Sequence, residues 1–307
     1  MDLFNLLISA LGQGFVYAPM ALGVFVSFRV LNTPDLTVDG SFVFGMTACA
    51  AVTVAGHPIG GILAGILAGA LEGLVTGLLQ TSLRLNPILS GILTMTGLYT
   101  VNYAVLGGQS NLYLQSTPEG GTPVPSNTIY KMFGSGDASS LLLSVLLVAA
   151  ACAGLIVFFK TRSGMAVRAT GDNEEMVRSS SINADLSRVG GIMLSNALVG
   201  FSGAMLCQQQ RYADLGCGSG MLVVGLASVI IGQALFGRHS VSLGILSAAV
   251  GSVVYRFILQ LAYQIDMPSY TVKLLSVIIV VAALSLPLAK QNLSLAKARR
   301  AGKGETK

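Results

Sequence analysis

Charged residues are scarce in this chain. Only 10% of its 307 residues are Asp, Glu, Lys or Arg, whereas soluble globular domains carry about 25%. So little charge cannot cover an ordinary water-facing surface, because 53% of the residues are hydrophobic and the mean hydropathy is +0.73. The composition excludes a soluble globular domain and indicates a polytopic membrane protein.

Residues that support metal or redox chemistry are also few. The four cysteines show no C-x-x-C spacing and three of them lie inside apolar runs, so they predict neither disulfides nor a metal site. The two histidines, His57 and His239, have no carboxylate or cysteine partners at ligand spacing, which argues against a metal centre or a catalytic triad. The phosphate-binding pattern G-x-x-x-x-G-K-[ST] is missing, so another polypeptide must supply any ATP hydrolysis.

What the chain does contain is a series of long apolar runs. Most approach the roughly 20 residues that a helix needs to cross a bilayer. They are continuously apolar and do not alternate, which favours helices over barrel strands. The nine segments are 3–28, 36–55, 59–83, 87–107, 139–159, 188–211, 220–236, 240–263 and 271–288. The sequence thus predicts an all-α polytopic membrane protein with about nine transmembrane helices and one transmembrane domain over 1–288.

The basic residues predict the orientation of these helices. With alternating crossings, 14 of the 18 Lys and Arg residues fall on one side, which the positive-inside rule assigns to the cytoplasm. The N-terminus is then outside, and the loop 160–187 and the basic tail 289–307 are inside. The net charge is +5, but the basic residues lie next to apolar spans, so they predict membrane topology. They do not indicate a nucleic-acid partner. The 14 residues are Arg29, Arg84, Lys160, Arg162, Arg168, Arg178, Arg188, Arg238, Lys290, Lys297, Arg299, Arg300, Lys303 and Lys307.

Two long polar segments interrupt the apolar runs. Residues 108–138 are rich in Gly, Pro, Ser and Asn, and we expect an extracytoplasmic docking surface or vestibule there. Residues 160–187 carry eight charges, and the pattern over 169–178 predicts one short helix capped by Thr170 or Asp172. Composition alone favours a solvated loop helix over a coupling helix that fits into an ATPase subunit.

Segments 36–107 and 215–288 resemble distant copies with opposite topology. Each begins with an Asp-Leu pair followed by Gly-Ser, continues into a glycine-spaced helix after a histidine, and then reaches Pro87 or Pro268. Inverted repeats around a midplane site are typical of transporters. Abundant Gly, Ser and Leu also produce such similarity by chance, and the sequence leaves both explanations open.

Several motifs together carry a resemblance to a known family. They are GMAVRATGDNEEM (164–176), the pair Ile182-Asn183, LSNALVGFSGA (194–204), PDLTVDGSF (34–42), NPILSGILTMTG (86–97) and VGLASVIIG (224–232). These motifs resemble ABC importer permeases of the branched-chain amino acid/ribose superfamily, and within it the tryptophan/tyrosine transport permeases. The resemblance runs from about Leu22 to Leu288. It departs at RSSSIN (178–183), where relatives more often carry Ala-Leu-Gly before Ile-Asn.

The resemblance implies a type II ABC importer permease fold and a set of partners. The complex would contain two copies of this chain, two ATPase subunits that bind ATP and Mg²⁺, and an extracytoplasmic substrate-binding lipoprotein. The chain itself would hold no cofactor, would contact membrane lipid, and would lie in the bacterial inner membrane with a cytoplasmic C-terminus. The residues implied to couple to the ATPase are Asp172, Asn173, Glu174, Glu175, Met176, Arg178, Ile182 and Asn183.

Polar residues within spans are candidates for the translocation pathway. Ionisable groups are costly in the bilayer, so each one needs a structural or functional role. Asp39 either caps its helix or faces the pathway. Glu72 and Arg256 differ in depth by roughly 9 Å at 1.5 Å per residue, which argues against a direct pair. Hydroxyl and amide groups can contact a passing zwitterion, although interhelical hydrogen bonding is an equal alternative for each. The expected pathway residues are Asp39, Ser41, Asn86, Ser90, Thr94, Thr96, Asn102, Ser195 and Asn196.

Other functions remain as alternatives. A stand-alone secondary transporter or channel would also suit an inverted repeat, but it predicts ion-coupling carboxylates at the midplane, where only Glu72 qualifies. A membrane scaffold without transport is disfavoured by the polar residues in the spans. The leading hypothesis is a permease for an amino acid or a similar small solute, and only the resemblance points to an aromatic amino acid.

Overall fold

Most of the chain is described by a computed structural model. It covers residues 3–116, 124–125, 127–134, 136–237 and 240–264, with isolated positions between 274 and 285. Within this part, seven helices are long and apolar enough to cross a membrane, and an eighth apolar helix, α2 (Val38–Val54), is shorter. The polytopic helical fold is therefore confirmed. The ninth predicted span lies largely outside the described residues, and the tail and His239 lie entirely outside them.

Eight of the nine predicted spans coincide with helices to within a few residues. The helices at these spans are α1 (Leu3–Phe25, continuing into a π-helical turn, Val26–Val30), α2, α3 (Pro58–Thr81), α4 (Pro87–Val105), α6 (Asp137–Lys160), α9 (Ala184–Gln210), α10 (Met221–Phe236) and α11 (Val241–Gln264). The short ones are α5 (Ile129–Phe133), α7 (Arg162–Asp172), α8 (Glu174–Ser179) and a 3₁₀ turn, Leu215–Gly218.

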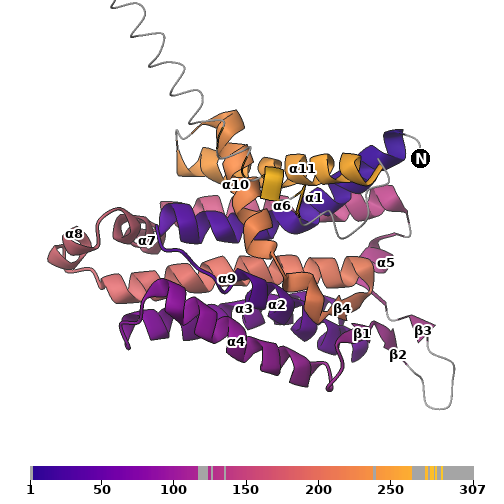
Figure 1. The fold of residues 1–307 in the computed structure, drawn as a ribbon, viewed down its shortest axis with the longest axis horizontal. Coiled ribbons are helices and arrows are strands. Elements are labelled where there is room, and N and C mark those ends of the chain that lie inside the picture. Colours follow the sequence, from indigo (N-terminus) through magenta and orange to yellow (C-terminus); the bar gives the residue numbers. More distant parts are fainter. Residues whose placement is uncertain are drawn as a thin grey trace, which may run out of the picture.

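Helix α9 runs through the centre of the molecule (Figure 1). Helices α2, α3 and α4 lie on one side of it, and α1, α6, α10 and α11 lie on the other. The short helices α7 and α8 project at one end, which we call the α8 end. At the opposite end, the strand end, β1 (Asn111–Tyr113) pairs antiparallel with β4 (Tyr212–Asp214), and β2 (Gln115–Ser116) pairs with β3 (Val124–Pro125).

Glycine brings α3 and α9 into close contact. Every fourth residue of α3 from Gly61 to Gly77 is glycine. A Cβ atom at Gly73 would lie 2.7 Å from the carbonyl oxygen of Ile192, and one at Gly77 would lie 3.0 Å from the Cα of Val189. Small residues at this spacing let helix backbones approach in a bilayer, where hydrophobic burial does not drive association. The position of α9 against α3 therefore depends on this glycine row.

Two local predictions require correction. The α9 helix begins at Ala184, not at residue 188, because the Asn183 side chain accepts the Leu186 backbone N–H at 3.1 Å and caps it. The polar segment 108–138 is not a continuous loop. It contributes β1, β2, β3 and α5, and the Thr128 side chain caps α5 by accepting the Lys131 N–H at 3.3 Å.

The fold sorts several basic residues between its two ends. Arg29 and Arg168 line one pocket at the α8 end, whereas Lys131, Arg211 and Arg256 line another at the strand end. This separation agrees with the predicted grouping of charges. Which end faces the cytoplasm, and whether the two halves are an inverted repeat, stay predictions.

Candidate functional site

The polar segment 160–187 forms two short helices that meet at Asn173. The backbone of Asn173 is extended (φ −159°, ψ 102°), which ends α7 at Asp172. The Asn173 side-chain oxygen accepts the Met176 N–H at 3.0 Å and so caps α8. The prediction of one helix over 169–178, capped by Thr170 or Asp172, was therefore wrong. The residue that begins α8 also interrupts the helix before it.

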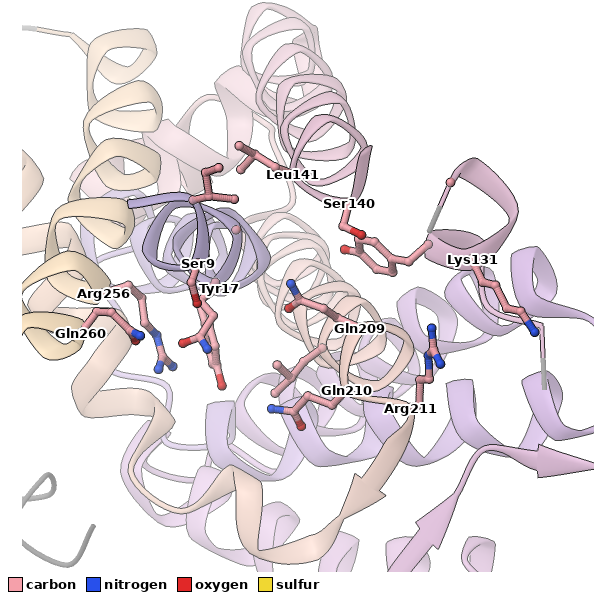
Figure 2. Close-up of a pocket in the computed structure, with 16 residues that line it drawn as sticks. Ser9, Tyr17, Lys131, Ser140, Leu141, Gln209, Gln210, Arg211, Arg256 and Gln260 are labelled. Carbon is pink, nitrogen blue, oxygen red and sulfur yellow. The ribbon is translucent and has the colours of Figure 1, made fainter. Parts of the chain in front are cut away.

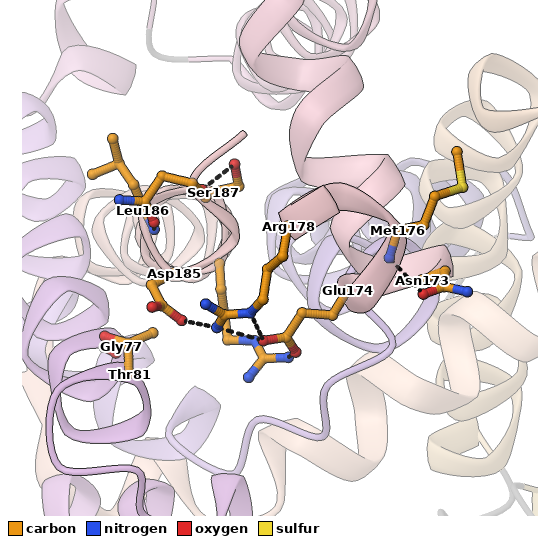
Figure 3. Close-up of polar contacts among 11 residues, drawn as sticks. Gly77, Thr81, Asn173, Glu174, Met176, Arg178, Asp185, Leu186 and Ser187 are labelled. Atoms are coloured by element: carbon orange, nitrogen blue, oxygen red, sulfur yellow. Dashed lines mark hydrogen bonds and ion pairs between the residues drawn. The ribbon is translucent and has the colours of Figure 1, made fainter. Parts of the chain in front are cut away.

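A network of ion pairs fixes α8 to the first turns of α9 (Figure 3). The Glu174 carboxylate accepts hydrogen bonds from Arg178, at 2.8 Å, and from Arg188. Arg178 also donates to Asp185 at 2.6 Å. The hydrogen bond from Arg178 is the main reason why the pKa of Glu174 lies below its ordinary value. Arg178, expected to pair with a carboxylate on an ATPase, is thus engaged within this chain.

Packing joins the same element to α1. A Cβ atom at Gly171 would overlap the carbonyl oxygen of Val30, so α7 touches the π-helical turn backbone to backbone. Val177 of α8 is buried. Helix α8 is therefore connected to α1 through α7 and to α9 through its ion pairs.

Four large apolar side chains of residues 160–187 are exposed at the α8 end. Leu186 is 70% exposed, Met176 is 64% exposed, Met165 is 54% exposed and Ile182 is 41% exposed. Glu175, next to Met176, is exposed as well. Apolar side chains exposed among charged residues are candidates for protein–protein contacts. Of the expected coupling residues, Glu174 and Arg178 hold the element together, and Asn173 and Asn183 cap helices. The exposed ones that remain available to a partner are Asp172, Glu175, Met176 and Ile182.

A buried polar cluster lies where the segment before α2 meets α9. The side-chain amide of Asn196 donates to one oxygen of Asp35 at 2.8 Å. The other oxygen accepts the Thr37 hydroxyl at 2.5 Å and the Thr37 backbone N–H at 2.9 Å. All three residues are fully buried. Three hydrogen bonds to one carboxylate offset much of the cost of burying it.

Glu72 adds a second buried carboxylate from α3. The Ser41 hydroxyl of α2 donates to one of its oxygens, and the Thr76 hydroxyl donates to the other at 2.9 Å. Glu72 is 2% exposed, and no described Lys or Arg lies within ion-pair distance of it. Arg256 instead lies over the ring of Tyr17, 3.4 Å from its centroid. Glu72 and Arg256 therefore do not pair directly, in agreement with the difference in depth that the sequence predicted.

A mainly apolar groove of about 530 Å³ lies beside Glu72, between α3 and α4. Among the described residues that line it, only Glu72 and Thr94 have polar side chains. The others are Phe44, Leu71, Val75, Leu79, Leu93, Gly97, Leu98 and Val101. Such a groove offers apolar surface along its length and a single acidic group at its wall.

Most of the remaining expected pathway residues serve helix contacts or caps. Asn102 accepts the Thr47 hydroxyl at 3.3 Å, and Ser195 donates to the Gly23 carbonyl at 2.7 Å, so both connect helices. The hydroxyls that bond backbone carbonyls of their own helix are those of Ser90, Thr94 and Thr96. The structure therefore does not gather the whole predicted set into one site. Ser41 and Asn196 lie in the buried carboxylate clusters, and Thr94 lines the groove.

Two of the expected residues are helix caps. Asn86 accepts the Ile88 N–H at 2.9 Å and caps α4. Asp39 accepts the N–H groups of Gly220 and Leu222, at 3.0 and 2.8 Å. It thus caps α10 and not its own helix, because the start of α10 lies next to it in space.

Sequence reasoning missed Asp35, Thr37 and Thr76. The pattern Asp35-Leu-Thr37 is that of a turn in which an Asp side chain accepts the N–H two residues on, as it does here. Glu72 and Thr76 are spaced i, i+4 on one face of a helix, which brings side chains together. Both signals were present in the sequence. Their connection to Asn196 and Ser41 was not, because those residues come from other helices.

The comparison with protein families decides what kind of protein this is. Residues 6–284 match the family described as "Branched-chain amino acid transport system / permease component". The chain belongs to this permease family. The permease is 33% identical over 292 residues to the "Tyrosine transport system permease protein" of Clostridioides difficile (strain R20291), covering 95% of this chain and 94% of that protein. It is 28% identical over 289 residues to an uncharacterized protein of Rickettsia prowazekii (strain Madrid E), covering 92% and 97%.

No solved structure matches the permease significantly. The family match includes α8, both buried carboxylate clusters and the groove. Because the family is a component of transport systems and not an enzyme family, the buried carboxylates of the permease call for an explanation in terms of packing or transport.

Proposed function

We propose that this permease is the membrane-spanning subunit of an ABC importer that carries an amino acid into a bacterial cell. An extracytoplasmic binding protein delivers the solute to the strand end. Two copies of the permease, in the inner membrane, assemble with two ATPase subunits at the α8 end. The basic residues Arg29, Arg168 and Arg178, which lie at the α8 end, support this orientation.

The attachment of α8 is the observation that carries the proposal. An ATPase that binds α8 must transmit its movement to the spans, and here Glu174 and Arg188 join α8 directly to α9. The exposed side chains of Glu175 and Met176 provide a surface for that contact. A loop helix that only faces water gains nothing from exposing an apolar side chain such as Met176, whereas a helix that binds a partner does.

The proposed pathway runs along α2, α3, α4 and α9. A zwitterionic amino acid brings an ammonium group, which the Glu72 carboxylate can contact, and a side chain that fits the apolar wall of the groove. Thr94 adds a hydroxyl on the same wall. Weak, separate contacts of this kind permit passage without tight binding. Ser41 and Asn196 act behind this wall by holding the two carboxylates in place.

The name of one relative suggests the substrate. The Clostridioides difficile relative is named for tyrosine transport and covers nearly the whole of both chains. We therefore propose an aromatic amino acid, with tyrosine as the first solute to test.

The exposed apolar faces of α3 and α4, which include Leu67 (62% exposed) and Tyr99 (64% exposed), suit contact with the second copy or with lipid.

Reconstitution tests this function. The permease, the ATPase and the binding protein are placed together in proteoliposomes, and uptake of radiolabelled tyrosine and ATP hydrolysis are measured. Met176→Asp should abolish co-purification of the ATPase and lower stimulated hydrolysis at least about ten-fold, since it places a charge in an apolar contact. Met132→Asp is the matched control, because Met132 is 62% exposed but lies in α5 at the strand end.

The alternative function gives a different result. A stand-alone secondary transporter or channel takes up tyrosine in liposomes that contain the permease alone, and Met176→Asp leaves that uptake unchanged. Equal ATPase association in Met176→Asp and the wild type would show that α8 is not the coupling helix.

A further inference from the structure

A cavity lies at the strand end, away from the groove beside Glu72. Its volume is about 1110 Å³, and it lies between the first half of α1, the last turns of α9 and α11, and the beginning of α6, with α5 at its edge. Figure 2 shows Arg256 and Gln260 on one side of this pocket, Arg211 and Lys131 on the other, and Gln209 and Gln210 between them. We call this cavity the strand-end pocket.

Positive charge dominates the strand-end pocket. Three of the described lining residues are basic, namely Lys131, Arg211 and Arg256, and no described Asp or Glu lines it. The ion pairs found in the described part of the chain all lie at the α8 end. A pocket with this lining attracts an anion, because like charges close together raise the local positive potential.

Arg256 is placed as the anchor for such an anion. Its guanidinium lies over the face of Tyr17, 3.4 Å from the ring centroid, which holds it in one orientation. The Nε atom is buried without a hydrogen-bond partner. Because Nε is buried, the terminal Nη groups of Arg256 are the donors that can meet an incoming carboxylate. Arginine presents its donors in the planar fork that matches a carboxylate.

The other polar residues define the chemistry of the ligand. Gln13, Gln209, Gln210 and Gln260 line the same pocket, so it presents both amide donors and amide acceptors. Lys131 and Arg211 are exposed, whereas Arg256 is half-buried, which places two charges at the rim and one deeper inside. A rim of positive charge increases the capture rate of an anionic group. The amides suit the ammonium and hydroxyl groups of a small polar molecule.

We propose that the strand-end pocket binds a small organic carboxylate, whose carboxylate group pairs with Arg256 and whose remaining polar groups contact the glutamine amides. If the proposed function holds, this pocket is a first binding site for the amino acid at the strand end, separate from the groove beside Glu72. Only the choice of tyrosine as a probe rests on the proposed function. Binding itself depends on this chain alone.

The test uses the full-length permease in phosphatidylcholine nanodiscs without an ATPase or a binding protein. Saturation-transfer NMR measures binding of three probes: L-tyrosine, its amide L-tyrosinamide, which lacks the carboxylate, and 3-(4-hydroxyphenyl)propionate, which lacks the ammonium. We expect tyrosine and the propionate to bind and tyrosinamide to lose at least about ten-fold in affinity, because it cannot form the charged pair.

Variants connect the binding to named residues. Arg256→Gln should reduce tyrosine affinity by about ten-fold or more, and Lys131→Gln by about two- to five-fold, since Lys131 lies at the exposed rim. Arg162→Gln, at the α8 end, is the matched control and should bind as the wild type does. Because Arg256 packs on Tyr17, its variant is also checked for folding by thermal unfolding. Lys131 is exposed, so Lys131→Gln should fold normally. Its effect on tyrosine affinity therefore tests the proposal even if Arg256→Gln does not fold.

A lipid phosphate is the other possible source of the anion. Nanodiscs that contain phosphatidylglycerol distinguish it, with lipid retention measured by native mass spectrometry. Retention of phosphatidylglycerol that depends on Arg256, without tyrosine binding, overturns the proposal, and so does equal binding of tyrosine and tyrosinamide. Binding that needs Arg256, in a permease that never associates with an ATPase, supports the pocket and refutes only the proposed function.

Discussion

The side-chain amide of Asn196 donates to the carboxylate of Asp35 at 2.8 Å, although 161 positions separate the two residues in the sequence. This bond joins α9 to the segment that precedes α2. A charge-assisted hydrogen bond in a buried site is roughly twice as strong as a neutral one, and removing one partner leaves the other unsatisfied. The relationship makes a direct prediction about stability.

Asn196→Ala should destabilise the permease by about 1–3 kcal/mol, because an oxygen of the buried Asp35 loses its amide donor. Asn102→Ala is the matched control, and we expect a loss nearer 0.6 kcal/mol, the average for interhelical hydrogen bonds in membranes. The Thr47 hydroxyl, the partner of Asn102, also bonds the Phe44 carbonyl and stays satisfied. Thermal unfolding in one detergent compares the two variants. Equal losses of stability in the two variants would mean that the hydrogen bond to Asp35 is no stronger than an ordinary interhelical one.

Glycine spacing in α3 gives a second prediction. Gly69→Ala should destabilise the fold by about 1–3 kcal/mol, because its Cβ atom would overlap the Asn196 carbonyl oxygen. Gly97→Ala is the control in α4, where a Cβ atom meets nothing within 4 Å. Alanine there should be neutral or stabilise the helix by up to about 1 kcal/mol. Unfolding measurements on both variants decide, and a neutral Gly69→Ala would contradict the observed α3–α9 contact.

Glu72→Gln tests the acidic wall of the groove. Glutamine has nearly the same shape, and its amide oxygen can still accept the hydrogen bond from Thr76. The Ser41 hydroxyl can donate to the Thr37 carbonyl instead, at 3.1 Å, so expression and thermal stability should remain near wild type. The carboxyl group is lost, and tyrosine uptake by the reconstituted importer should fall at least about ten-fold if the ammonium group contacts it. Glu72→Asp, which retains a carboxyl group, should restore part of the uptake. Full uptake by Glu72→Gln would remove Glu72 from the pathway.

The docking of α8 should depend on pH. Because the pKa of Glu174 is lowered in the folded protein, chiefly by Arg178, its ion pairs stabilise α8 above the ordinary pKa of about 4.5. That stabilisation is lost as the pH falls through the lowered pKa of Glu174. A spin label on Ser180→Cys should therefore become more mobile in acid, as measured by electron paramagnetic resonance. In Glu174→Gln the label should be mobile at neutral pH already, and its mobility should not change with acid.

The orientation makes the last prediction. Single cysteines at Lys131 and Ser180, both exposed and at opposite ends, should react with an impermeant maleimide from opposite sides of the membrane. Lys131 should label in intact cells, and Ser180 only after permeabilisation. Labelling of both from outside would refute the assignment of the α8 end to the cytoplasm.

The sequence by itself determined the membrane class, the positions of eight spans to within a few residues, and the separation of Arg29 and Arg168 from Lys131, Arg211 and Arg256. These properties depend on local composition, because the bilayer requires long apolar helices and places positive charge on one side. The family motifs, which are also local, predicted the permease family that the comparison confirmed.

Only the tertiary structure decided the partners of the polar side chains. Asp39 caps α10, Arg178 pairs with Glu174 and Asp185, and Asn196 bonds Asp35. In each case a buried or charged group takes whichever donor or acceptor the packing of another segment brings near it. Helix packing here depends on glycine contacts between α3 and α9, whose register is a property of two surfaces together. One-dimensional spacing therefore could not say which polar residues meet.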